Sequence, residues 1–360
     1  MSTMKRIGAA LLAFATLVCV CCSCNQSNTK TILTVGDEDV PSGVYLLYLS
    51  QAIGELDEKI EDAGFTGDRW SYTDADVKNA KTWVKDTALE YTVELVAVEK
   101  KFAELGLSFT PDELSSIESN AQYYWDGMSY SGYMMPGVKD SYEKMGISYP
   151  SFLRVYKLGS MGGEIIESIY GKGGEKEITD DEYKTYMTEN YSRVNHILIS
   201  SQDEEGNELT GDALTEAETK AKDLLTQAQS ADEETFRQLI IDNSKDYSED
   251  SDLDLGYVAP LENSGYVTEF EDAIKALKPG ETSAELCKSE YGWHIIRRYE
   301  MFGDDLVSLD DYRDTLMTTM KQDEYEALKA EWAKSVKYTL VKASFNRYDP
   351  TDKRFAPAEE

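Results

Sequence analysis

Two short stretches decide the fold: "SRVNHILIS" at residues 192–200 and "SEYGWHIIRRYE" at residues 289–300. Each contains an apolar run that predicts a β-strand. They also hold His196 and His294, the only two histidines among the 360 residues. Because alternate residues of a strand face one side, both imidazoles can point to the same face of a sheet. A single histidine in such a strand is usually a core residue, but two of them favour a functional pair.

The chain is strongly acidic. It has 36 basic residues against 68 acidic ones, which gives a net charge of -32. Binding to nucleic acid needs a basic surface, so we expect no nucleic-acid partner. Hydrophobic residues make up 41% of the sequence, which suffices for a globular core. The length suggests two or three domains.

The N-terminus has the anatomy of an export signal. Lys5 and Arg6 precede an apolar stretch at residues 7–22, and the sequence then turns polar. The apolar stretch is too short for a comfortable membrane span. We predict a signal peptide over residues 1–23 and a tether over residues 24–32.

Cys24 begins the polar tether, and this region resembles a bacterial lipoprotein signal. The resemblance implies a lipid on Cys24 that anchors the chain to the outer face of the bacterial cell membrane. Cys21 stands where leucine is usual in such signals, and an ordinary secretion signal cut nearby remains the alternative. Cys287 is the only cysteine in the rest of the chain. We expect it to form no internal disulfide and to be a small buried hydrophobe.

Residues 33–180 are predicted to form a mostly helical domain. Apolar residues recur at helical spacing across 73–107, and Thr110 with Glu113 forms a capping box that starts another helix. The stretch 123–156 is dense in tyrosine and methionine. We expect a helix-loop-helix whose aromatic side chains pack within their own domain. An adaptable surface for unfolded segments is the alternative.

A second module is predicted over residues 181–302, where strands and helices alternate. Thr179 and Glu182 form a capping box in front of it. A C-terminal helix and strand at residues 303–345 are expected to pack back on the N-terminal domain, followed by a tail at residues 346–360. The predicted fold class is α+β, with a small antiparallel sheet and flanking helices inserted in a mostly helical domain. Strands are expected at residues 193–199, near 255–258 and at 291–299, and helices at 214–229, 233–242 and 268–277.

The sequence predicts no cofactor and no metal. Zinc needs three or four ligands at workable spacing, and neither histidine has a neighbouring Cys or His in its strand. No Gly-x-Ser-x-Gly elbow marks an activated serine. Calcium is an alternative for the carboxylate-rich stretch "DYSEDSDLD" at residues 246–254, which however lacks the central glycine and terminal glutamate of an EF-hand loop.

Residues 190–300 resemble the parvulin family of prolyl isomerases, also called rotamase or PpiC-type domains. The resemblance rests on four segments in the right order, and the first and last of them carry the two histidines. The flanking signal and helical regions resemble PrsA-like and SurA-like secreted foldases. The four segments are "VNHILI", "FRQLIIDNSKDYSEDSDLDLGYV", "YVTEFEDAIKALKPGETS" and "SEYGWHIIRR".

This resemblance implies a membrane-anchored foldase outside the cytoplasm, which catalyses cis-trans isomerisation of Xaa-Pro bonds and also acts as a chaperone. Its partners would be unfolded or newly exported polypeptides. A holdase chaperone with a vestigial, non-catalytic parvulin module is the alternative. The sequence leaves the oligomeric state open, with a homodimer among the options.

The resemblance also assigns site residues. His196 and His294 would form a hydrogen-bonded pair at the floor of a proline pocket, with Asp246 near the substrate carbonyl and Ser289 as a hydroxyl tied to the histidines. A purely structural role of the histidines, orienting the sheet, remains the alternative. The walls of the pocket would be Leu255, Tyr266 and Phe270.

Three departures from the family pattern affect this site. Asp252 and Leu253 stand where two leading glycines are usual, which alters the loop before Leu255. Tyr266 stands where many relatives carry methionine or leucine, so we expect a narrower or more polar pocket. The acidic loop at residues 200–211 lacks a basic cluster, so phosphoserine-proline substrates would be repelled.

Overall fold

The computed structural model describes residues 30–130 and 133–356. Cys24 and the predicted signal peptide lie outside the described residues, as does the end of the tail. The chain divides into two compact units. The first combines the residues up to Lys100, Ser108–Ser160 and the residues from Glu331 on, and the second combines Lys101–Leu107 with Met161–Ala330.

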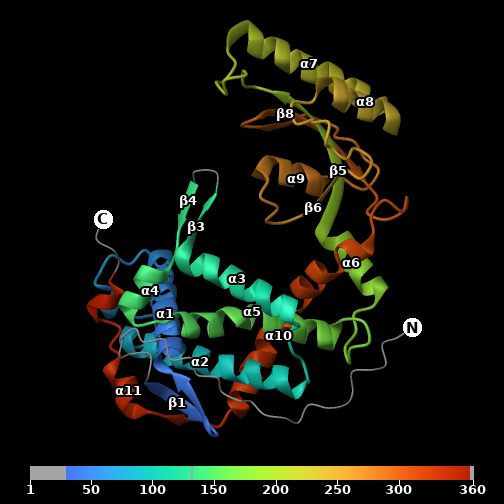
Figure 1. The fold of residues 1–360 in the computed structure, drawn as a ribbon. Helices are drawn as coiled ribbons and strands as arrows, with labels where there is room; N and C mark the ends of the chain where they lie inside the picture. The colour runs from blue at the N-terminus through green and yellow to red at the C-terminus, as the bar shows by residue number, and fades with distance from the viewer. Residues whose placement is uncertain (1–29, 131–132, 357–360) are drawn as a thin grey trace. The chain divides into compact units, whose positions relative to one another are not determined.

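The first unit has a small three-stranded sheet among its helices. In this sheet β1 (Thr31–Val35) pairs antiparallel with both β2 (Glu38–Pro41) and β9 (Thr339–Leu340). Segments from the two ends of the described chain therefore lie side by side, near α11 in Figure 1. The helices of this unit are α1 (Ser42–Asp62), most of α2 (Ala80–Glu104), α3 (Pro111–Asp126), α4 (Lys139–Met145), the first part of α5 (Tyr149–Tyr170) and α11 (Lys342–Arg347), with 3-10 turns at Arg69–Ser71 and Lys353–Phe355.

One hydrophobic core holds this unit together. Tyr45 and Leu49 of α1 and Leu95 of α2 are completely buried in it. Burial of a large apolar side chain contributes about 1.5–3 kcal/mol to stability. The C-terminal segment adds three more buried side chains to the same core, namely Val336, Tyr348 and Phe355.

Both predicted capping boxes are confirmed. The hydroxyl of Thr110 accepts the backbone N–H of Glu113, and the Glu113 carboxylate accepts the Thr110 N–H at 2.7 Å. The same reciprocal pair forms between Thr179 and Glu182, at 2.8 Å for the Thr179 N–H. These side chains satisfy backbone N–H groups that would otherwise lack a partner at the helix start.

The helix expected across 73–107 begins later than the apolar spacing suggested, at Ala80. The carboxylate of Asp74 accepts the backbone N–H groups of both Asp76 and Val77 at 2.6 Å. This local bonding makes a turn that competes with helix formation. The end of the helix, at Glu104, lies close to the expected one.

The stretch at 123–156 differs from the expected helix-loop-helix. A β-hairpin of β3 (Gly127–Tyr130) and β4 (Tyr133–Pro136) stands between α3 and α4 and is visible in Figure 1. Trp125 and Phe152 do pack within the first unit, with ring centroids 5.4 Å apart. The hairpin methionines Met128, Met134 and Met135 are exposed.

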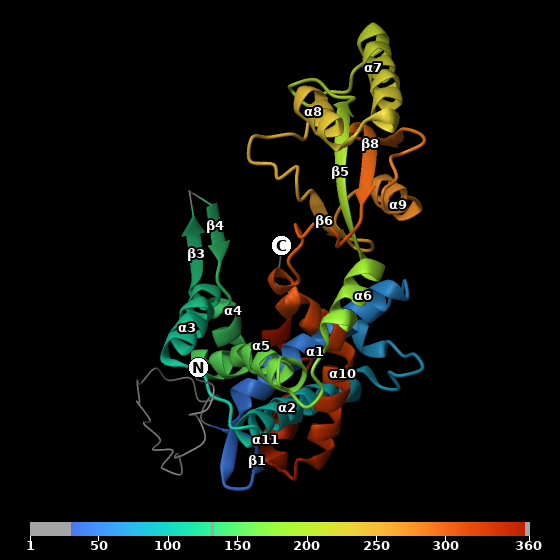
Figure 2. The same cartoon turned by 90° about the vertical axis from the view of Figure 1, so that its right-hand side faces the viewer.

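The second unit contains a four-stranded antiparallel sheet. Its central strands β5 (Tyr191–Ser200) and β8 (Gly292–Tyr299) run side by side in Figures 1 and 2. The strand order is β6 (Tyr257–Pro260), β5, β8 and β7 (Cys287–Ser289). The helices of this unit are the second part of α5, α6 (Asp180–Asn190), α7 (Gly211–Ser230), α8 (Glu233–Asn243), α9 (Thr268–Ala276) and most of α10 (Arg313–Ser335), with a 3-10 turn at Leu309–Asp311.

The two faces of this sheet carry different helices. Ile197 and Ile295 point to the face covered by α7 and α8. Val194 and Ile296 point to the other face, where Phe270 of α9 packs. Side chains alternate between the faces along each strand, as the period of a strand requires. The α+β class expected from the sequence is confirmed.

The expected final strand differs in its extent. The pairing with β1 covers only Thr339–Leu340, and the chain then turns into α11. The strand expected near 255–258 begins at Tyr257, after a turn. Among the helices in the described ranges, none is both long and apolar enough to cross a membrane.

Candidate functional site

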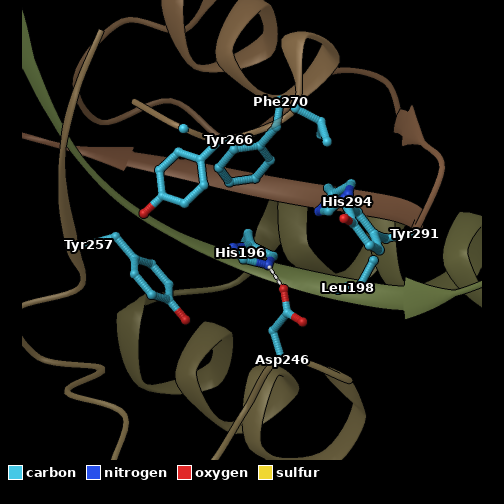
Figure 3. A pocket seen from close by; sticks show the side chains of 10 residues that line it. His196, Leu198, Asp246, Tyr257, Tyr266, Phe270, Tyr291 and His294 are labelled. Carbon is cyan, nitrogen blue, oxygen red and sulfur yellow. Dashed lines mark hydrogen bonds and ion pairs between the residues drawn. The ribbon is translucent and has the colours of Figure 1, made fainter. Parts of the chain in front are cut away.

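Strands β5 and β8 bring the two histidines together. In their antiparallel register His196 lies opposite Ile296, and Leu198 lies opposite His294, so the histidines are diagonal neighbours on one face. Their ring centroids are 5.3 Å apart. Figure 3 shows the two side chains from close by. Gly292 starts β8 at a φ of +144°, and a Cβ there would clash with the Ile199 carbonyl. Glycine therefore permits the close approach of the two strands.

Each histidine is held by a different partner. The Nε2 atom of His196 lies 2.9 Å from the Asp246 carboxylate, and the Nε2 atom of His294 lies 2.7 Å from the Ser289 hydroxyl. The hydrogen bond expected directly between the two imidazoles is not formed, and each Nε2 atom binds one of these partners instead. Both Nδ1 atoms are buried and have no partner among the described residues.

The environment of His294 keeps it neutral. The residue is 5% exposed, and burial lowers the pKa of its imidazole to about 4, with the neighbouring His196 acting in the same direction. The charge of Asp246 opposes this shift but does not outweigh it. Ser289 is also buried, and its hydroxyl accepts the backbone N–H of Tyr291 at 3.2 Å. At neutral pH the pocket floor therefore holds an uncharged His294.

Asp246 comes to the site through the segment that follows α8. The Ser244 hydroxyl accepts the backbone N–H of Leu198 at 3.0 Å, and the Lys245 N–H donates to the Leu198 carbonyl at 2.8 Å. These bonds hold the segment against β5. The hydrogen bond from His196 lowers the pKa of the Asp246 carboxyl, which is therefore ionised at neutral pH.

These residues border a pocket of about 430 Å³. Phe270 of α9 is 5% exposed, and its ring centroid lies 5.0 Å from that of His196 and 5.1 Å from that of His294. Tyr266 contacts Phe270 at 5.4 Å in an edge-on arrangement. In Figure 3 the rings surround one hollow. The lining residues are His196, Leu198, Asp246, Tyr257, Gly265, Tyr266, Val267, Phe270, Tyr291 and His294.

Leu255 does not line this pocket, contrary to expectation. It lies in the turn before β6, where its backbone N–H donates to the Asp252 carboxylate at 2.9 Å. Gly256 has a φ of +71°, and a Cβ there would clash with the Val194 carbonyl. Pairing of β6 with β5 starts only after this turn, at Tyr257, which lies opposite Val194. Tyr257 therefore takes the wall position that was expected for Leu255.

Tyr257 was missed by the sequence reasoning. Its ring stacks on His196 at 5.7 Å, with an angle of 28° between the ring planes. Leu198 and Tyr291 also line the pocket without having been assigned to it. The two-residue period of the first strand places Leu198 on the face of His196, and this signal could have found it.

Asn195 supports the altered loop from the opposite face of the sheet. It is 1% exposed, and its side-chain N–H donates to the Leu253 carbonyl at 2.8 Å. Arg237 forms an ion pair with Asp254 in the same loop. The loop that lacks the usual glycines is therefore fixed by side chains. The sequence signal for this role was the side-chain amide of Asn195, which stands next to His196 inside an otherwise apolar strand.

Cys287 differs in part from the expected buried hydrophobe. It is only partly buried and forms no disulfide. Its thiol donates to the Glu269 carbonyl at 3.2 Å, and burial raises its pKa to about 11. Over the described ranges, no group of three or more His, Cys, Asp or Glu side chains could hold a metal ion.

Comparisons with known proteins agree with this geometry. Residues 196–300 match the model of the rotamase family, described as the PPIC-type PPIase domain. These residues form a parvulin-type domain, and we call residues 181–302 the parvulin module. Part of the chain is similar to proteins named foldase PrsA and chaperone SurA.

Two relatives illustrate the similarity. A foldase protein PrsA of Clostridium perfringens is 28% identical over 176 residues, which cover 44% of this chain and 46% of that protein. A chaperone SurA of Nitrosospira multiformis is 31% identical over 152 residues, which cover 42% of this chain and 31% of that protein. The chain thus spans less than half the length of these curated relatives. A crystal structure of PrsA from Lactococcus lactis aligns with 88% of this chain and 97% of its own, at 14% identity and a TM-score of 0.38.

Proposed function

We propose that the parvulin module catalyses cis-trans isomerisation of Xaa-Pro bonds in unfolded polypeptides. One observation carries this proposal: an apolar pocket of about 430 Å³ lies directly over the neutral His294 and the ionised Asp246. The reaction breaks no bond. Its barrier, about 18–20 kcal/mol, is the loss of amide resonance on twisting. A catalyst needs only to favour the twisted amide over the planar one.

The pocket residues can do this in two ways. The ring of Phe270 provides an apolar surface for the proline ring and removes water from the amide. In that environment the charge-separated form of the planar amide is less stable than in water, so twisting costs less. The Asp246 carboxylate, placed near the substrate carbonyl, disfavours negative charge on that oxygen and so weakens the double-bond character of the C–N bond.

The histidines have positioning roles in this proposal. His196 holds Asp246 in place through its Nε2 atom, and Ser289 holds His294 through its hydroxyl. Each reduction of the barrier by about 1.4 kcal/mol raises the rate tenfold.

NMR exchange spectroscopy on a short Xaa-Pro peptide tests this function. The full-length protein should accelerate exchange, and Phe270→Ala should reduce kcat/KM by at least about tenfold, since it removes the main apolar surface. Ile274→Val, on the same helix but outside the pocket lining, is the matched control. Exchange at the uncatalysed rate with the wild-type protein would refute the proposal.

A chaperone activity of the first unit is a second proposal, and the exposed hairpin favours it. Met134 is 75% exposed and Met135 is 57% exposed, which is unusual for methionine on a soluble surface. Flexible thioether side chains adapt to many apolar partners. The variant with Met134→Ser and Met135→Ser should suppress aggregation of an unfolded model protein less well, with peptide isomerisation unchanged. Equal suppression by this variant would contradict the proposal.

We also propose a location outside the cytoplasm, with a lipid on Cys24 as anchor and newly exported polypeptides as clients. The basic start at Lys5 and Arg6, the apolar stretch and the polar tether support this proposal. A Cys24→Ala variant should leave the membrane fraction, and mass spectrometry of the mature N-terminus checks the lipid. A wild-type chain without lipid on Cys24 would overturn the proposal of a lipid anchor.

A further inference from the structure

The mouth of the pocket differs in chemistry from its floor. Phe270 and His294 at the floor are each 5% exposed. Tyr257, Tyr266 and Tyr291 are 37%, 43% and 48% exposed, so three tyrosine rings form the rim that meets the solvent. Neither lysine nor arginine occurs among the residues that line the described pocket.

Asp246 adds one carboxylate to this aromatic rim. Its Oδ2 atom is bound by His196, while the side chain remains 45% exposed. The Asp246 charge is close enough to raise the pKa of Tyr257, after burial, which is the larger cause. In Figure 3 Asp246 and the hydroxyl end of Tyr257 lie on the same side of His196. Further exposed carboxylates follow Asp246 in the chain, namely Glu249, Asp250 and Asp252.

Aromatic faces next to a carboxylate favour a cation. A lysine or arginine side chain gains from the electron-rich face of a tyrosine and from the opposite charge of an acid. An acidic side chain would meet the Asp246 carboxylate, and no lysine or arginine among the residues that line the described pocket would compensate its charge. The rim therefore favours a positively charged substrate side chain over a negatively charged one.

The position of the cation follows from the chemistry of the Xaa-Pro bond. With the proline ring against Phe270, the carbonyl of the preceding residue lies at Asp246. The side chain of that preceding residue leaves the carbon atom bonded to this carbonyl. It is therefore the substrate side chain nearest to Asp246 and Tyr257.

We propose that the pocket selects Xaa-Pro bonds in which the residue before proline is lysine or arginine. This inference rests on the proposed isomerase function and names its substrate class. Tyr257 and Asp246 are the specificity-determining residues. The long aliphatic stem of the lysine or arginine lies along the tyrosine ring, and the charged end reaches the carboxylate.

Three peptides that differ only at the residue before proline test the inference: lysine, its uncharged analogue norleucine, and glutamate. NMR exchange with the full-length protein should give a kcat/KM for the lysine peptide about fivefold above that for norleucine, and the glutamate peptide should be the slowest. Added salt should reduce the lysine-to-glutamate ratio. Equal acceleration of all three peptides would refute this inference and leave the isomerase function standing. No acceleration of any peptide would refute the isomerase function itself.

Two substitutions of Tyr257 locate the effect. Tyr257→Leu removes the aromatic face and should lower the lysine-to-norleucine ratio towards one. Tyr257→Phe keeps the face and should retain most of the ratio, which makes it the matched control. The ratio cancels any general loss of activity or folded protein. An unchanged ratio in Tyr257→Leu, or an equal loss in both variants, would overturn the assignment.

Discussion

Acid should destabilise the parvulin module through His294. The ordinary pKa of a histidine is 6.5, whereas burial holds that of His294 at about 4. On acidification the unfolded chain therefore takes up a proton near pH 6.5, and the folded chain takes it up only near pH 4. The stability that depends on the neutral ring is fully present above pH 6.5. It is lost as the pH falls through this window.

The size of the effect follows from the pKa difference. One unit corresponds to about 1.4 kcal/mol, so the full difference for His294 sets an upper limit of about 3 kcal/mol. Because the pocket above the ring is open to water, we expect about 2 kcal/mol between pH 7 and pH 4.5. The pKa of Asp246 is also lowered, from 3.8, by its bond to His196. Protonation of Asp246 therefore also destabilises the folded chain, but it occurs below this pH range.

Native-state hydrogen exchange measures the effect where it arises. Amides of β5 and β8 report on opening of the sheet, so their protection factors at pH 7 and pH 4.5 should be compared in the wild type and in His294→Gln. Glutamine keeps a polar group within reach of Ser289 but does not titrate. The wild type should lose about 30-fold more protection than the variant on acidification. Equal losses in the two proteins would show that His294 does not control the acid response.

Two further predictions concern contacts around the sheet. Asn195→Ala removes the side-chain hydrogen bond to the loop at 252–256, so hydrogen exchange of the loop amides should become faster and kcat/KM should fall about fivefold. The amides of β8 should keep their protection. Loss of β8 protection would indicate a general structural role of Asn195 instead. Arg193 is only 3% exposed, and its guanidinium forms a bidentate ion pair with Asp304. Asp304→Asn weakens this pair and should lower the free energy of unfolding of the second unit by about 2 kcal/mol, measured by urea titration. Asp305→Asn is the exposed control, and an equal effect in both would contradict the argument.

The central part of the fold could be predicted because local pattern and tertiary contacts agree there. Around His196 and His294 the two-residue period identifies strands, and the same period assigns each side chain to a face. The capping box at Thr179 and Glu182 likewise depends only on a segment of four consecutive residues, and it forms as expected. The helix start predicted at residue 73 was wrong, and the helix begins at Ala80, because the competing turn at Asp74 also satisfies the backbone locally.

The pocket wall could not be predicted fully, since it depends on contacts between distant residues. The turn before β6 is fixed by Asn195, which lies far from it in the sequence. The family resemblance placed Leu255 at the wall, but the turn continues through Gly256, and Tyr257 is the first residue that pairs with β5. The Ser289 hydroxyl was expected to bind the histidines, and it does bind His294. The bond between His196 and Asp246 was not expected, because the two residues lie 50 positions apart in the chain.

The pairing of β1 with β9 has a consequence for the order in which the two units can fold as the chain emerges from its N-terminal side. Residues 31–35 emerge long before residues 339–340, yet the first unit needs both to complete its sheet. Val336, Tyr348 and Phe355 reach its core equally late. The second unit ends at Ala330. The first unit therefore stays open, with Leu33 lacking one of its two partner strands, until residues 339–340 have emerged, whereas the second unit can close earlier.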